Sequence, residues 1–304
     1  MRIDEMLSSN RPVFSVEFFP PKTDEGRQTL FETVEVLGRL DPHFFSVTYG
    51  AGGATREGTL DTTRAIRDQY DSEAMAHLSC VGESVESLRE IIERISDAGI
   101  ENILALRGDP PRGQKDFEQP EGGLGSASEL AALIHETHPE IAIGGACFPE
   151  VHPEAASLEA DLAYLKTKVD NGVRFLITQL FFDNQIYFDF VPAARAAGID
   201  VPIIPGVMPM TGFRQIARIS ELCQASIPDP LASAMESLDG DERAEFELGV
   251  AYATQQCADL LRRGAPGIHL YALNRWPAAR AILGALHASK PWEDREPAGA
   301  AGAA

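Results

Sequence analysis

The amino-acid sequence predicts an α/β fold, a single-domain (β/α)8 (TIM) barrel. Three observations predict it: the chain has 304 residues, eight short apolar strands alternate with helical segments, and polar side chains follow the strands at their carboxyl ends. Most neighbouring strands begin about 30 residues apart, which is the length of one strand-plus-helix unit. A doubly wound open sheet is the alternative that the same alternation allows.

The strands are indicated by short runs of Ile, Val, Leu and Phe. We expect them at residues 12–18, 44–49, 74–80, 102–108, 141–147, 174–180, 201–207 and 267–273. Between them apolar residues recur at helical spacing, as at Leu88, Ile92 and Ile95, and a glycine such as Gly99 or Gly172 ends the helix. The last interval, between residues 207 and 267, is longer than the others and contains two apolar helical stretches.

The composition argues against several classes of partner and of protein. Asp and Glu number 46 against 26 Lys and Arg, a net charge of −20, which argues against duplex DNA or an anionic membrane as a partner. No apolar run approaches the roughly 20 residues of a membrane span, and the N-terminal residues lack a signal-peptide pattern, so we expect a cytoplasmic protein. The scattered cysteines contain no C-x-x-C pair, and we expect no metal site. Residues 291–304 are expected to form a disordered, low-complexity tail after a barrel of residues 1–290.

Candidate functional residues gather where the strands are expected to end, which is the catalytic face of such a barrel. Glu17 and Thr48 end the first two strands, and His77 lies near the end of the third. The later strand ends are followed by Arg107, Asp109, Phe148, Glu150, His152, Gln179, Gln215, Asn274 and Arg275. Side chains from separate strands would therefore converge on one mouth.

Alternation along the strands predicts which side chains face the lumen. Ser15 and Glu17 share one face of the first strand, and Arg107 and Asp109 share one face of the fourth. Because the larger apolar set should face the helices, we expect Glu17 and Asp109 at the mouth of the lumen. The apolar neighbours of Glu17 predict a raised pKa, as a general acid requires near neutral pH. A strand-end glutamate paired with an arginine is the alternative, and for Asp109 the spacing alone favours a partner of Arg107 or a helix cap.

The segment YGAGGATREGT, residues 49–59, invites comparison with a dinucleotide-binding loop. Gly50 and Gly52 match the first two glycines of G-x-G-x-x-G, but Thr55 occupies the third position. We interpret the segment as a strand-to-helix loop whose backbone amides could bind a phosphate.

Nine segments, in order along the chain, carry a resemblance to a known family: VEFFPPK (16–22), SVTYGAGGATREGT (46–59), AHLSC (76–80), ALRGDPP (105–111), PEVHPEA (149–155), DLAYLKTKVDNG (161–172), ITQLFFD (177–183), IIPGVMP (203–209) and HLYALNR (269–275). Together they resemble methylenetetrahydrofolate reductase in its compact bacterial form, the catalytic barrel alone. The resemblance implies an oxidoreductase of one-carbon metabolism with bound FAD. NADH or NADPH would reduce the flavin, which would then reduce 5,10-methylenetetrahydrofolate to 5-methyltetrahydrofolate for methionine synthesis, in a ping-pong reaction at one site.

The same resemblance implies roles for individual residues. Glu17 matches the general acid that protonates N10 of the folate, and Asp109 matches an aspartate close to both flavin and pterin. The implied cofactor contacts are Thr48, Tyr49, His77, Arg107, Gly108, Asp109, Ala127, Phe148, His152, Ala155, Asp161, Tyr164, Thr167 and Lys168. Among them, Arg107, His152 and Lys168 would supply the positive charge that a diphosphate needs. The implied folate contacts are Asp109, Gln179, Gln215, Tyr271 and Arg275.

The match departs from the family at several flavin and folate positions. Phe148 stands where tyrosine is common, Tyr164 and Thr167 stand where asparagine and arginine often help to bind flavin, and Ile219 stands where an aromatic residue can stack on folate. Two alternatives therefore remain: a flavin-independent reductase with direct hydride transfer, and a non-catalytic folate- or flavin-binding protein. Glu17, together with Asp109 and Gln179, counts against the latter. The family also implies a homo-oligomer, and the choice between NADH and NADPH is left open.

Overall fold

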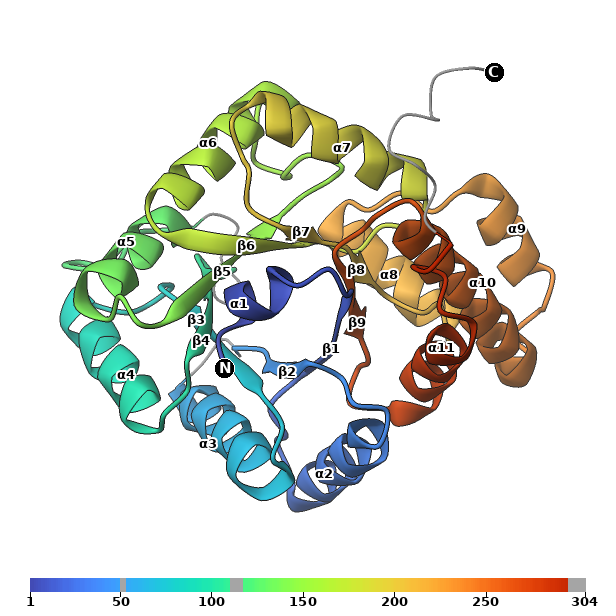
Figure 1. Ribbon diagram of the computed structural model, residues 1–304, viewed down its shortest axis with the longest axis horizontal. Helices are drawn as coiled ribbons and strands as arrows, with labels where there is room; N and C mark the ends of the chain where they lie inside the picture. The colour runs from blue at the N-terminus through green and yellow to red at the C-terminus, as the bar shows by residue number, and fades with distance from the viewer. Residues whose placement is uncertain (50–52, 110–116, 295–304) are drawn as a thin grey trace.

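The computed structural model describes residues 1–49, 53–109 and 117–294, without the side chains of residues 53–56. Parallel strands surround a central lumen, and a ring of helices surrounds the strands (Figure 1). This arrangement confirms the predicted (β/α)8 barrel. Positions 50–52 of the glycine-rich segment and residues 295–304 of the predicted tail lie outside the described residues.

Within the described part of the chain, nine parallel strands form one sheet in the order β7-β6-β5-β4-β3-β2-β1-β9-β8. Their bounds are β1 Val13–Phe18, β2 Phe44–Val47, β3 Ala74–Ser79, β4 Asn102–Leu106, β5 Ala142–Cys147, β6 Val173–Thr178, β7 Ile203–Ile204, β8 Gly206–Val207 and β9 Gly267–Tyr271. Each of the eight predicted strands is found, and most end one or two residues earlier than predicted.

The predicted strand 201–207 is split in two by Pro205, which has no amide hydrogen for a ladder. β7 pairs with β6, and β8 pairs with β9. The Pro205 carbonyl still accepts a hydrogen bond from the His269 N–H at 3.0 Å. Gly206 is required here, because a Cβ at this position would lie 2.4 Å from the Thr178 carbonyl oxygen. The chain passing through Pro205 therefore closes the barrel, and the two halves count as one of its eight strands.

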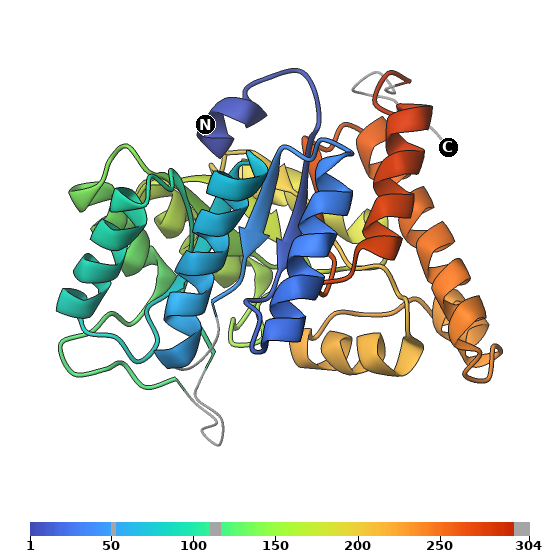
Figure 2. The ribbon, with the colours of Figure 1, turned by 90° about the horizontal axis from the view of Figure 1, so that it is seen from below.

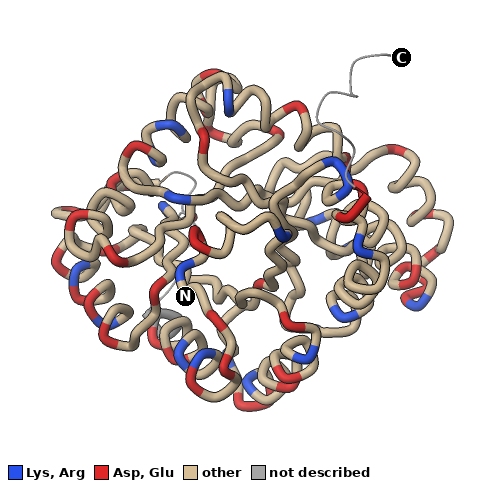
Figure 3. The backbone as a smooth tube through the Cα atoms, viewed as in Figure 1, with Lys and Arg blue, Asp and Glu red and all other residues tan. Residues whose placement is uncertain are grey.

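The outer ring consists of α2 Asp24–Gly38, α3 Gly53–Tyr70, α4 Val85–Asp97, α5 Ala127–Thr137, α6 Leu158–Asp170, α7 Asn184–Ala196, α10 Glu242–Arg262 and α11 Trp276–Ser289. Ser84, Ser126 and Ser157 begin three of these helices, and each hydroxyl accepts a backbone N–H of the first turn. Gly99 and Gly172 follow α4 and α6 with φ of 70° and 108°, as the sequence predicts for residues that end helices. Acidic and basic positions are interspersed around this ring, so the charge of −20 is not gathered in one place (Figure 3).

The two faces of the strands pack against different cores. Phe14, Val16 and Phe18 of β1 belong to the large core beneath the helices, which leaves Ser15 and Glu17 on the lumen face as predicted. In β4, however, Ile103 and Ala105 pack toward the helices. Alternation alone would therefore point Asp109 away from the lumen, so that step of the sequence argument is wrong. β4 ends at Leu106, and Gly108 takes a φ of 89°, which breaks the alternation before Asp109.

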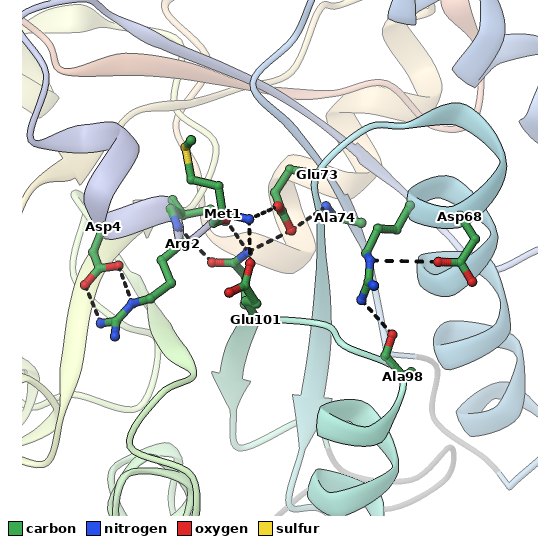
Figure 4. Close-up of polar contacts among 11 residues, drawn as sticks. Met1, Arg2, Asp4, Asp68, Glu73, Ala74, Ala98 and Glu101 are labelled. Atoms are coloured by element: carbon green, nitrogen blue, oxygen red, sulfur yellow. Dashed lines mark hydrogen bonds and ion pairs between the residues drawn. The ribbon is translucent and has the colours of Figure 1, made fainter.

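A short helix that the sequence did not predict, α1 Ile3–Leu7, closes the amino-terminal end of the barrel (Figures 1 and 2). Ile3 and Leu7 are buried in the small apolar core that fills this end of the lumen. Figure 4 shows the polar contacts around it: the Met1 amine contacts Glu73 and Glu101, and Arg2 pairs with Asp4 at 2.7 Å. α1 therefore covers the lumen at the end where the strands begin.

The long interval between β8 and β9 contains α8 Phe213–Cys223 and α9 Asp229–Glu236 before α10 begins. The sequence predicted α8 and α10 but not α9. α8 lies at the end of the barrel opposite α1 (Figure 2) and packs with α9 into a separate apolar cluster that includes Met208, Met210, Ile216, Leu231 and Met235. This excursion borders the open mouth of the barrel.

The packed part of the chain continues past residue 290. Trp292, inside the predicted tail, packs against Phe14 with ring centroids 5.5 Å apart. Among the described residues, no helix combines the length and the apolar character that a membrane span requires.

Candidate active site

A cavity of about 670 Å³ opens at the carboxyl ends of β3 to β6, within the size range of small-molecule and cofactor sites. Most of the predicted cofactor contacts line it. The predicted residues in its wall are Tyr49, Arg107, Gly108, Asp109, Ala127, Phe148, His152, Ala155, Asp161, Tyr164, Lys168 and Gln179. The structure therefore brings together segments that the sequence spreads over more than a hundred residues.

Other predicted contacts lie elsewhere. Gln215 and Arg275 are exposed on α8 and before α11, and Thr167 is exposed on α6, where its hydroxyl donates to the Ala163 carbonyl. The Tyr271 hydroxyl donates to the Thr178 carbonyl at 2.7 Å inside the barrel. Glu17, Thr48 and His77 are also outside the cavity wall.

An ion pair at the cavity joins Arg107 to Glu154, a residue to which the sequence assigned no role. Nη1 of the arginine lies 2.5 Å from Oε2 of the glutamate, and Nη2 lies 2.8 Å from Oε1. These hydrogen bonds raise the pKa of Arg107 and lower that of Glu154. The signal was present in the motif PEVHPEA, which places an acid two residues after His152. An anionic ligand would have to share Arg107 with Glu154.

The other two residues predicted to carry positive charge, Lys168 and His152, differ in their contacts. The buried Lys168 Nζ donates to the Ala146 carbonyl at 2.6 Å, and burial lowers its pKa. Burial also lowers the pKa of His152, which acts against a positive charge on its imidazole in the ligand-free protein. The charge that His152 would offer a diphosphate stays a prediction. Among the described residues of this wall, Arg107 and Lys168 are the arginine and lysine.

The close approach at Gly108 and the orientation of the Gln179 amide shape the cavity. A Cβ at Gly108 would lie 2.0 Å from the Ser79 hydroxyl oxygen, so only glycine allows this close approach. The Gln179 side-chain oxygen accepts the Leu180 N–H at 2.9 Å, which orients its amide. Among the residues that the structure describes, no group of His, Cys, Asp or Glu side chains is arranged to hold a metal ion.

A second polar group lies inside the barrel, and we call Ser15, Glu17, Ser46, His77 and His269 the lumen cluster. One carboxylate oxygen, Glu17 Oε2, is 3.1 Å from His269 Nε2, 3.4 Å from His77 Nε2 and 3.5 Å from the Ser46 hydroxyl. The Ser15 hydroxyl lies 2.7 Å from His269 Nδ1. The sequence analysis did not single out His269. The signal was its position two residues before Tyr271 in HLYALNR, which puts both side chains on the same face of the strand.

The lumen cluster corrects the predicted acidity of Glu17. Burial acts to raise its pKa, but the charge that His77 gains at acid pH and the hydrogen bond from His269 outweigh burial, so the pKa is lowered. Burial lowers the pKa of His77 to about 4. The free protein therefore holds Glu17 as a carboxylate at neutral pH.

The comparison with protein families identifies this arrangement. Residues 2–287 match the family model described as methylenetetrahydrofolate reductase. The chain belongs to the methylenetetrahydrofolate reductase family. It is 39% identical to the 5,10-methylenetetrahydrofolate reductase of Escherichia coli over 272 residues, which are 90% of each protein.

Larger relatives match as well. The chain is 38% identical to methylenetetrahydrofolate reductase (NADH) 1 of Zea mays, covering 96% of this chain and 52% of that protein. It thus spans about half the length of the plant relatives. A solved Clostridium thermocellum protein, described as binding two copies of 5-methyl-5,6,7,8-tetrahydrofolic acid, shares the fold with a TM-score of 0.62 at 15% identity, over 95% of this chain and 99% of that one.

Proposed function

We propose that this member of the methylenetetrahydrofolate reductase family reduces 5,10-methylenetetrahydrofolate to 5-methyltetrahydrofolate, with FAD and a reduced nicotinamide. The observation that carries the proposal is the placement of two features at the same end of the barrel: a cavity walled by Arg107 and Lys168, and the carboxylate of Glu17. The names of the E. coli and maize relatives support the substrate, and the maize name supports NADH as the donor. The cytoplasmic location and the homo-oligomer belong to the same proposal, and light scattering tests the latter.

The cavity wall fits a flavin dinucleotide. Arg107 and Lys168 would bind the diphosphate, and Gly108 would let the end of β4 lie close against Ser79 in the wall behind the cofactor. Bound there, FAD would supply the hydride carrier between nicotinamide and folate. The pairing of Arg107 with Glu154 leaves less free charge for a diphosphate, which favours direct hydride transfer from the nicotinamide as the second candidate.

Glu17 supplies the acid chemistry of this proposal. The five-membered ring of the folate must open before reduction, and opening requires a proton at N10 and leaves an iminium cation at N5. Glu17 would donate that proton from its carboxyl group and then, as a carboxylate, stabilise the cation. Because the pKa of Glu17 is lowered in the free protein, the proposal requires that Glu17 take a proton from solvent as the folate binds, which happens if the bound folate raises this pKa. Asp109 would add a second negative charge from the cavity wall.

The first test is the absorbance of the purified protein under anaerobic conditions. Flavin bands should bleach with NADH and recover with 5,10-methylenetetrahydrofolate. A colourless protein that stays inactive after FAD is added would overturn the proposal. A colourless protein that oxidises NADH with the folate would support direct transfer.

Glu17→Gln tests the acid. Reoxidation of the reduced flavin by the folate should slow by about 100-fold or more, because Gln cannot give up a proton, while reduction by NADH should change little. Glu159→Gln, at an exposed position on α6, is the matched control. If both half-reactions survive Glu17→Gln, the assignment of Glu17 is wrong.

A further inference from the structure

The lumen cluster contains a fully buried histidine that the proposed mechanism does not use. We propose that His269, with its tautomer set by Ser15, is a positioning residue that holds one carboxylate oxygen of Glu17 and leaves the other to face the substrate. This inference rests on the proposed function, because it concerns the group to which that function assigns the proton.

The hydrogen bonds define the direction of donation. A carboxylate only accepts, so the contact of His269 Nε2 with Glu17 Oε2 at 3.1 Å requires the hydrogen on Nε2. Nδ1 of the neutral ring then accepts, and the Ser15 hydroxyl donates to it at 2.7 Å. With a doubly protonated ring, Ser15 would have to donate to the Ile268 carbonyl instead, at 3.5 Å, which is too long for a good O–H···O bond. Donation therefore runs from Ser15 to His269 to Glu17.

The ring of His269 is fixed in its plane as well as at its nitrogens. Phe44 stacks on one side, with centroids 6.3 Å apart and an interplanar angle of 27°. Tyr271 meets the ring edge-on at 5.3 Å and 87°, and its own hydroxyl is anchored on the Thr178 carbonyl. The side chain is 0% exposed, so protein atoms enclose the ring on all sides. Such packing is what a positioning residue requires.

His77 does not have the same role. Its Nε2 approaches Glu17 Oε2 at 3.4 Å, but among the described residues this nitrogen has no hydrogen-bond partner. Burial lowers the pKa of His77 to about 4, so its ring is neutral when the enzyme works near pH 7. The groups that face the Glu17 carboxylate are thus His77 from β3, Ser46 from β2, and His269 and Tyr271 from β9, and His269 makes the shortest contact.

The contacts of the Glu17 carboxylate involve one of its two oxygens. Within the described part of the chain, His269, His77 and Ser46 all meet Glu17 on Oε2. Oε1 is left as the oxygen that carries the proton to the substrate. Fixing Oε2 therefore determines where that proton is presented.

The test measures the ionisation midpoint of Glu17 directly, by infrared difference spectra of the wild type against Glu17→Gln during a pH titration. His269→Leu removes the donor and should raise the midpoint by at least about one pH unit, because an unpaired buried carboxylate is harder to ionise. Ser15→Ala should give a smaller shift in the same direction. His269→Gln, whose amide can donate from nearly the same place, should restore most of the wild-type midpoint. Met75→Leu, in the apolar core of the lumen, is the control that should leave it in place.

Kinetics supply the second readout. With His269→Leu, reoxidation of the reduced enzyme by the folate should slow by about 10- to 100-fold, and its decline with rising pH should move to higher pH along with the infrared midpoint. A midpoint that stays unchanged in folded His269→Leu and Ser15→Ala proteins would overturn the inference. If the wild type does not reduce the folate and yet the midpoint moves, the proposed function fails while the contact between His269 and Glu17 stands.

Discussion

The lumen cluster and the rim of the cavity each contain a carboxylate held by nitrogen donors, and they differ in exposure. At the rim, the side chains of Arg107 and Glu154 are 25% and 55% exposed, and both partners are charged. In the lumen, the side chains of Glu17 and His269 are 13% and 0% exposed, and the donors near neutral pH are imidazole and hydroxyl groups. Both regions lie at the open end of one barrel.

This difference in exposure determines what the rim and the lumen cluster can each do. Water and salt screen the rim pair, so Arg107 can exchange Glu154 for a ligand anion at little cost. In the lumen, the charge on Glu17 depends on a few fixed neighbours, because little solvent is present to replace them. A dry site of this kind suits the control of a proton, and the wet rim suits reversible binding of an anionic cofactor.

The largest expected effect comes from the lumen and concerns stability at acid pH. The pKa of His77 is about 4 in the folded protein against 6.5 ordinarily, so the unfolded chain binds a proton between these values that the folded chain does not. Stability should therefore fall as the pH falls from about 6.5 to 4, by about 3 kcal/mol from this residue. Denaturant unfolding across this range measures the slope.

His77→Gln should flatten that slope, whereas His135→Gln, on the exposed surface of α5, should leave it unchanged. The lowered pKa of Glu17 acts in the same direction, since protonating it at still lower pH removes its hydrogen bond from His269. An equal slope in wild type and His77→Gln would show that the lumen cluster does not control acid stability.

The next effect separates ligand binding from folding at the cavity wall. Lys168→Met should weaken FAD binding by about 10- to 100-fold, because a charge-assisted contact to a phosphate is lost. The midpoint of thermal unfolding without FAD should stay the same or rise, because a buried cation is replaced by an apolar side chain of similar size. Flavin fluorescence measures the affinity. Unchanged affinity would remove Lys168 from the site.

The smallest effect is expected at the exposed pair. Glu154→Gln should strengthen FAD binding by about two- to fivefold, because Arg107 no longer has a competing carboxylate, and high salt should abolish the gain. The same titration at low and high salt measures it. Weaker binding would mean that Glu154 orients Arg107, and the rim would then resemble the lumen more closely than we propose.

The sequence predicted most of the fold because strands and helices follow local periodicity. The short helices α1 and α9, of five and eight residues, escaped because neither is long enough to repeat an apolar pattern. The division of strand 201–207 at Pro205 also escaped, since the direction in which each half pairs depends on its neighbours. The strand ends were predicted too late because residues typical of strands, such as Tyr49, Leu180 and Leu273, follow the last residue of the ladder.

In the candidate site, too, the sequence predicted some features, and others depended on neighbours that only folding brings close. Motif order placed Arg107, Lys168 and Gln179 in one cavity wall, and alternation placed Glu17 in the lumen. The predicted rise in the Glu17 pKa was wrong because the contacts with His77, His269 and Ser46 outweigh the burial that the sequence predicted. Its real neighbours come from other strands, and His269 is 252 residues away along the chain.

By itself the sequence determined the barrel, the family and the identity of the residues at the open mouth, because periodicity and motif order are properties of a linear chain. Only the tertiary structure decided the acidity of Glu17, the pairing of Arg107 with Glu154, and the lowered pKa of His152. These depend on burial and on hydrogen-bond partners a few ångströms away, and folding brings such partners together from distant strands and loops.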